Sequence, residues 1–135
     1  MQNVITVCLF LILLVACQPK QTDVSVRLLH QQTELLLNLS PASAPVETPL
    51  RITLLTKQSV EAINAELSGI SMYMGLVPLR FQKLSTQTAS GEEQWQAEFM
   101  LGACSDPAML WQLNLTVQFA DGRKLSINER FNSSW

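Results

Sequence analysis

The sequence has little of what most enzyme sites need. Its 135 residues include a single histidine, His30, and neither a glycine-rich phosphate loop, a G-x-S-x-G elbow nor an H-E-x-x-H motif is present. A nucleophilic pair of Cys104 and His30 would have no recognisable third group to orient the base. We therefore expect a protein that is not an enzyme, with His30 as a solvated residue of a turn.

Charge is also scarce. The chain carries nine basic and eleven acidic residues, for a net charge of −2. No stretch gathers the lysines and arginines that would neutralise a phosphate backbone. This composition argues against nucleic acid as a partner.

One long apolar run is present, and it lies at the start of the chain. It extends from Val4 to Ala16 with Thr6 as its one polar residue, which suits the core of a signal peptide and is short for a membrane-spanning helix. The run ends in LVAC at residues 14–17, which resembles the lipobox of bacterial lipoprotein precursors. The alternative is an uncleaved anchor in which the LVAC match arises by chance.

The lipobox resemblance implies a processing pathway. Residues 1–16 would be removed as a lipoprotein signal peptide, and Cys17 would carry a diacylglycerol thioether and an acyl chain such as palmitate. Residues 17–23 would then be the lipidated cysteine and its tether, and several chains on one residue hold a protein firmly on a membrane. Gln18 resembles the sorting residue of outer-membrane lipoproteins. We expect a protein on the periplasmic face of the bacterial cell envelope, anchored in the outer membrane through Cys17.

Cysteine usage leaves one thiol to explain. Of the three cysteines, Cys8 would leave with the signal peptide and Cys17 would be capped by lipid. Cys104 is then a solitary thiol in a compartment where disulfides are normal.

The remaining residues, 24–135, alternate between apolar and polar almost throughout, which is typical of half-buried strands. HQQ at residues 30–32 and Asp121-Gly122 are read as turns. Residues 59–69 have both helical and strand periodicity, and we interpret them as a strand because their neighbours are strands. The other strands are expected at residues 24–28, 33–39, 50–56, 78–84, 93–101, 110–120 and 124–131.

This pattern predicts an all-β domain over residues 24–135. Seven or eight short antiparallel strands in that length are typical of an immunoglobulin-like two-sheet sandwich. We expect its core to include the apolar residues of the most regular strands, namely Trp95, Phe99, Leu113, Leu115 and Val117.

Two loops concentrate sulfur. Met72 and Met74 share one face of an extended segment that stops at Gly75, while Cys104 and Met109 lie in the connection between two strong strands. If both loops lie at one end of the sandwich, these four side chains form a soft ligand set that suits Cu(I) better than Zn²⁺, Ca²⁺ or Mg²⁺. Tyr73 and Trp111 would shield such a site from water.

These motifs also resemble a known family. The Met-x-Met-Gly of residues 72–75, the later W-x-A-x-F strand and the W-x-L-x-L-x-V strand look like small periplasmic β-sandwich proteins of the YtkA-like and copper-chaperone type. The resemblance implies that Met72 and Met74 are copper ligands. It also implies a role in copper buffering or delivery.

An alternative stays open on the same residues. Paired methionines can fill an irregular gap in a core, and free cysteine is among the most often buried residues. On that interpretation the protein is a non-enzymatic envelope lipoprotein that binds an envelope protein partner, as a scaffold without metal.

Overall fold

The structure, a computed structural model, describes residues 25–85 and 90–135. The predicted signal peptide, the lipobox with Cys17 and the tether lie outside the described residues. Across the described part of the chain there are nine strands and no helix, and hence no helix that could cross a membrane. The strands are β1 (Arg27–Gln32), β2 (Leu35–Ser40), β3 (Leu50–Thr56), β4 (Val60–Gly69), β5 (Leu76–Leu79), β6 (Gln82–Lys83), β7 (Glu93–Phe99), β8 (Leu110–Phe119) and β9 (Lys124–Asn132).

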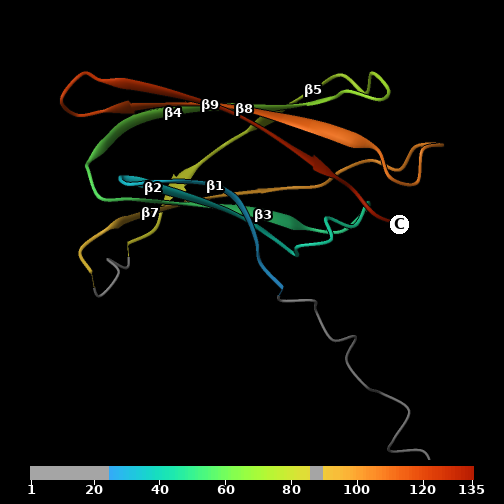
Figure 1. Ribbon diagram of the computed structural model, residues 1–135, viewed down its shortest axis with the longest axis horizontal. Coiled ribbons are helices and arrows are strands. Elements are labelled where there is room, and N and C mark those ends of the chain that lie inside the picture. The colour runs from blue at the N-terminus through green and yellow to red at the C-terminus, as the bar shows by residue number, and fades with distance from the viewer. Residues whose placement is uncertain (1–24, 86–89) are drawn as a thin grey trace, which may run out of the picture.

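The strands form two antiparallel sheets that pack face to face (Figure 1). The five-stranded sheet has the order β1-β2-β3-β7-β6, and the four-stranded sheet has the order β5-β4-β8-β9. The predicted all-β two-sheet sandwich is therefore confirmed, with nine strands in place of seven or eight. The ambiguous segment at residues 59–69 is a strand, because β4 pairs along almost its whole length with β8.

The strand boundaries predicted from the sequence are wrong in two places. The segment predicted as one strand at residues 78–84 is two short strands, of which β5 pairs with β4 and β6 pairs with β7. The chain crosses from one sheet to the other between them. Pro78 explains why β5 stays at a sheet edge, since proline lacks the N–H that a second neighbouring strand would need.

The predicted turn at residues 30–32 is the second error. Strand β1 runs through these residues to Gln32 and turns at Thr33 and Glu34 instead. His30 is partly buried, and its Nδ1 lies 2.7 Å from Glu129 Oε1 on β9. It is therefore not a solvated turn residue; it joins the edges of the two sheets.

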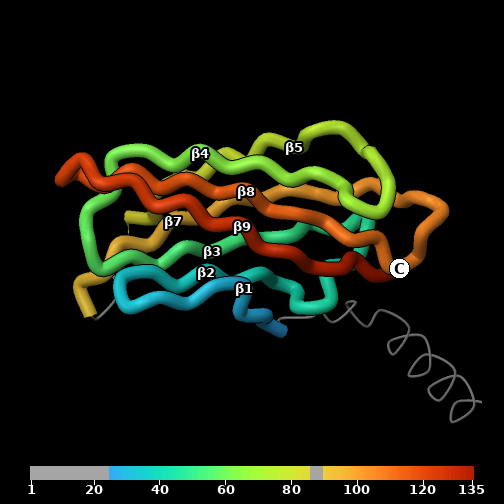
Figure 2. Tube along the Cα trace, turned by 45° about the horizontal axis from the view of Figure 1, so that its top comes forward, coloured from blue at the N-terminus to red at the C-terminus, as the bar shows by residue number. Residues whose placement is uncertain are grey.

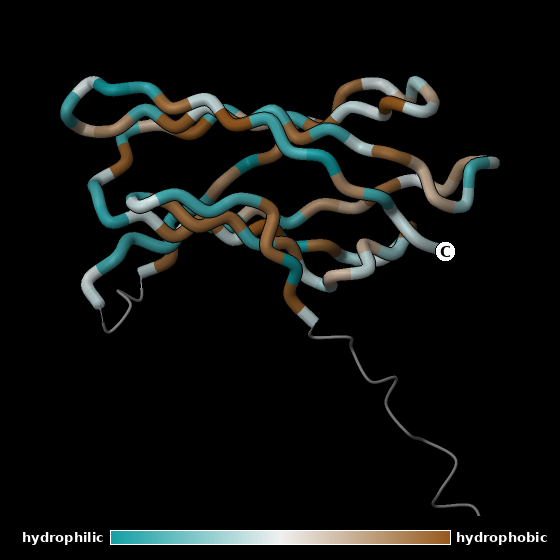
Figure 3. The backbone as a smooth tube through the Cα atoms, in the orientation of Figure 1, coloured by the Kyte–Doolittle hydropathy of each residue, from teal (hydrophilic) through white to brown (hydrophobic). Residues whose placement is uncertain are grey.

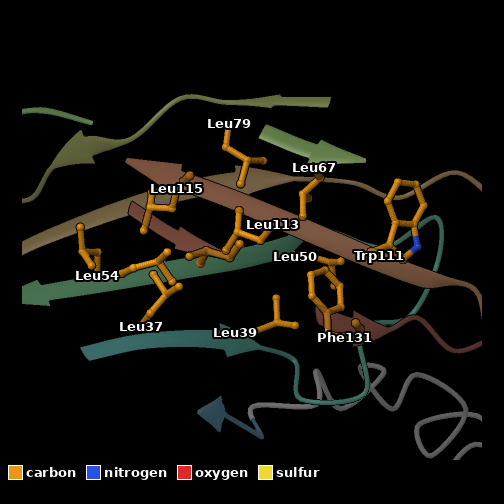
Figure 4. Close-up of a cluster of buried hydrophobic side chains, with 14 of the residues drawn as sticks. Leu37, Leu39, Leu50, Leu54, Leu67, Leu79, Trp111, Leu113, Leu115 and Phe131 are labelled. Carbon is orange, nitrogen blue, oxygen red and sulfur yellow. The ribbon is translucent and has the colours of Figure 1, made fainter. Parts of the chain in front are cut away.

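The core lies between the sheets and is built by the inward faces of the alternating strands (Figure 4). Burial removes this apolar surface from water and is the main force that holds the sheets together. Leu113, Leu115 and Val117 are fully buried, as predicted. Trp95 and Phe99 are partly buried and only pack against the core. Trp95 pairs with the exposed Lys83 of the edge strand β6.

The antiparallel order sorts the loops to two ends. One end, here called the tether end because the first described residue lies there, collects the loops at residues 41–49, 70–75 and 100–109 and the segment 133–135. Backbone hydrogen bonds connect them: Ala42 N donates to Ser25 O at 3.0 Å, and Glu47 N donates to Leu101 O at 2.8 Å. Figures 1 and 2 both show the β4–β5 and β7–β8 loops side by side at this end.

Candidate metal centre

The two sulfur-bearing loops meet at the tether end, as the copper hypothesis requires. Ile70 N donates to Leu110 O at 2.8 Å, and Leu110 N donates to Ser71 Oγ at 3.1 Å. These reciprocal bonds join the start of the β4–β5 loop to the start of β8. The loop closes at Gly75, whose φ of 78° is strained for any residue with a side chain.

Gly69 allows this close approach. A Cβ atom at this position would overlap both the methyl group of Met109 and the carbonyl oxygen of Met72. Met109 therefore lies directly beneath the backbone that carries the β4–β5 loop. The signal in the sequence that marks this close approach is a glycine at the end of a strand.

The centre of the candidate site is a pair of sulfur atoms. Cys104 Sγ lies 3.4 Å from Met109 Sδ. The thiol is partly buried, while Met109 is only 1% exposed. The backbone N–H of Asp106 also points at Cys104 Sγ, at 3.4 Å, so the turn at residues 104–106 fixes the thiol beside the thioether.

The two loop methionines lie nearer the surface. Met74 is 36% exposed, and its methyl carbon would lie 3.7 Å from a Cβ atom at Gly102, in the strand connection that leads to Cys104. Met72 is 40% exposed, and its backbone carbonyl oxygen occupies the space that a Cβ atom at Gly69 would need. The structure thus places all four predicted residues at one end and brings Cys104 and Met109 into direct sulfur contact.

The donor set has the softness that Cu(I) prefers. Two sulfur atoms that each bind one ion at about 2.3 Å can be at most about 4.6 Å apart, and the Cys104–Met109 separation of 3.4 Å satisfies this limit. Over residues 25–85 and 90–135, no group of three or more His, Cys, Asp or Glu could hold a metal. The nearby carboxylate of Asp106 accepts a hydrogen bond from Ala108 N at 3.0 Å. Sulfur is therefore the ligand type that this place offers, and soft thiolate and thioether ligands are of the kind that suits Cu(I).

The two aromatic residues that were expected to shield the site differ in burial. Trp111 is buried, and its indole N–H donates to Ser133 Oγ at 3.3 Å. Tyr73 is 80% exposed and covers nothing. The exposure of Tyr73 contradicts a shielding role for it, and shielding by Trp111 stays a prediction.

An open hollow lies at the other end of the sandwich. It has a volume of about 570 Å³ and is lined by residues of the β1–β2 turn together with Leu55, Lys57 and Glu92. It is open, mostly polar and at the opposite end of the sandwich from the sulfur atoms. We place no site there, because its lining offers no converging group of metal ligands or nucleophiles.

Comparison with known proteins supports the fold alone. No family model matches the chain, and no curated protein matches it in sequence. Among solved structures, the chain is similar to a DUF4426 family protein from Pseudomonas aeruginosa PAO1. The similarity has a TM-score of 0.52 at 13% identity and covers 81% of this chain and 94% of that one. A cycloalternan-degrading enzyme from Trueperella pyogenes aligns with a TM-score of 0.48 at 13% identity, over 70% of this chain and 14% of that enzyme.

Proposed function

We propose that this protein is a lipid-anchored protein of the bacterial envelope that binds one Cu(I) ion through sulfur and buffers or delivers it. The observation that carries the proposal is the 3.4 Å contact between Cys104 Sγ and Met109 Sδ. Met72 and Met74, on the adjoining loop, are the residues that would complete the ligand set from the outer side of the domain.

The position of these residues suits exchange of an ion. Met109 is buried beneath Gly69, so one ligand is held by the core, whereas Met72 and Met74 lie on an exposed loop. A site with a fixed inner ligand and movable outer thioethers allows an incoming sulfur ligand to replace one that leaves.

The experiment is a titration of the mature protein in detergent with Cu(I) under reducing conditions, in competition with a chelator of known affinity. We expect one equivalent to bind, with little competition from Zn²⁺, since thioethers are poor zinc ligands. Binding by a thiolate releases a proton, so the affinity should fall as the pH is lowered.

Two variants separate ligands from packing residues. Cys104→Ser should remove the strongest ligand, while Met100→Leu changes an exposed methionine outside the site and should leave the affinity unchanged. Absence of binding by the parent, or equal binding by Cys104→Ser, contradicts the proposal and favours the metal-free scaffold.

A further inference from the structure

The exposed large apolar side chains of the described residues gather at one end of the sandwich. The β4–β5 loop and the first residue of β5, in the sequence ISMYMGL at residues 70–76, contribute five of the nine. Tyr73 and Trp135 protrude furthest, at 80% and 70% exposed. The full set is Val26, Leu28, Ile70, Met72, Tyr73, Met74, Leu76, Met100 and Trp135. All of them lie in the loops of the tether end or within two residues of it along a strand.

Charge has the opposite distribution. The loops of the tether end, at residues 41–49, 70–75, 100–109 and 133–135, contain only two charged residues, Glu47 and Asp106. Arg27, Arg51 and Glu98 lie within two residues of this end along a strand. The turns at the other end are rich in charge: Glu34, Lys57, Asp121 and Arg123 all lie there. Figure 3 shows this contrast, with the β8–β9 turn in teal and brown stretches in the β4–β5 loop. Exposed apolar groups that cluster in this way mark an interaction surface.

The tether emerges at this same end. Ser25 packs against the β2–β3 loop, because Ala42 N donates to its backbone carbonyl at 3.0 Å. Seven residues lie between Cys17 and Ser25, so the chain from one to the other has eight residue steps and spans at most about 29 Å. The stretch from Ser25 to the β1–β2 turn is itself about 26 Å long. The charged end therefore reaches a membrane that holds Cys17 only if the tether is fully extended along the sandwich.

We infer that the tether end of the sandwich is a membrane-contact surface, with the β4–β5 loop and Trp135 seated in the lipid interface. This inference rests on lipidation of Cys17, which is part of the proposed function, and is independent of copper. Tyrosine and tryptophan favour the interface because they combine an apolar ring with a polar group that stays hydrated. The lipid anchor supplies the affinity, and the apolar end fixes which face of the domain meets the bilayer.

The test places a fluorophore at either end of the acylated, full mature protein. A polarity-sensitive dye is attached through Tyr73→Cys at the tether end, or through Lys57→Cys at the charged end as the matched control, both with Cys104→Ser. Each protein is reconstituted into phosphatidylcholine vesicles with brominated acyl chains, which quench dyes that lie in or near the bilayer. Co-flotation with the vesicles measures anchoring separately.

The expected result is severalfold stronger quenching of the dye at position 73 than at position 57, with equal flotation of both proteins. Equal and weak quenching at both positions in floating protein overturns the inference and shows that the tether holds the domain away from lipid. Weak quenching in vesicles with protection of position 73 in native envelope membranes also overturns it, because a protein partner then covers this end. Failure to float contradicts the lipid anchor itself, and the inference falls with it.

Discussion

Cys104 Sγ and Met109 Sδ lie 3.4 Å apart, five residues from each other within the β7–β8 loop. The loop folds back on itself because Asp106 N donates to the Cys104 sulfur and Asp106 Oδ1 accepts from Ala108 N. A thiol and a thioether are thus held together by local backbone geometry. Such preorganisation lowers the entropy that binding of an ion would otherwise cost.

Replacement of the two loop methionines separates the metal role from packing. Met72→Leu with Met74→Leu keeps the apolar volume, and both side chains are exposed, so the free energy of unfolding should change by less than about 1.5 kcal/mol. The Cu(I) affinity should fall clearly, as measured by chelator competition. If the double variant retains the affinity of the parent, the two methionines are not ligands.

The buried Trp111 should dominate the stability of the tether end. Trp111→Ala removes a fully buried ring and the indole donor to Ser133, and should cost about 3–5 kcal/mol in denaturant unfolding. Trp135→Ala, which changes an exposed ring, is the matched control and should be nearly neutral. A small effect of Trp111→Ala would mean that the ring is not part of the core.

The carboxylate of Glu93 makes the stability of the fold depend on pH. Burial acts to raise the pKa of Glu93, but hydrogen bonds from Lys83, the backbone of Val60, Ser59 and Trp95 outweigh it and leave this pKa below its ordinary value of 4.5. Because the folded pKa is lowered, its contribution to stability is present above about pH 4.5 and is lost as the pH falls through the folded value.

The variant Glu93→Gln tests this pH dependence. At pH 7 it should be less stable than the parent by about 1 kcal/mol. The difference should shrink as the pH is lowered below 4.5, as followed by urea unfolding at several pH values. A difference that stays constant with pH would show that the carboxylate charge is not responsible.

The predicted membrane anchor depends on lipidation of Cys17. Cys17→Ser removes the thiol that would be lipidated, so the protein should appear in the soluble fraction or remain an unprocessed precursor. Fractionation of cells and the mass of the protein distinguish these outcomes from the parent. A variant that is processed and fractionates with membranes as before would contradict the lipobox interpretation.

Period-two alternation was enough to predict the sandwich, because each strand shows one face to the core and one to water. It could not place Trp95 correctly, because the cross-strand partner of Trp95 is the exposed Lys83 of the edge strand β6, and alternation does not show which strands pair. The contact of His30 with Glu129 could not be predicted either, because Glu129 is distant in sequence and belongs to the other sheet.

The candidate site was predictable to the level of loops. Met72, Met74, Cys104 and Met109 do lie at one end, as ligand chemistry and strand order indicated. The direct contact of Cys104 with Met109 depends on the turn at Asp106, and the burial of Met109 depends on the missing side chain at Gly69. Neither close approach is visible in an alternation pattern.

The most direct test of a sulfur-bound Cu(I) is X-ray absorption at the copper edge on the loaded, reduced protein. We predict a first shell of sulfur alone at about 2.3 Å, in place of the shorter bonds of about 2.0 Å that nitrogen or oxygen ligands give. The Cys104→Ser variant should lose one sulfur from this shell or fail to bind the ion. A first shell of nitrogen or oxygen, or one that Cys104→Ser leaves unchanged, would contradict a copper centre built on Cys104 and Met109.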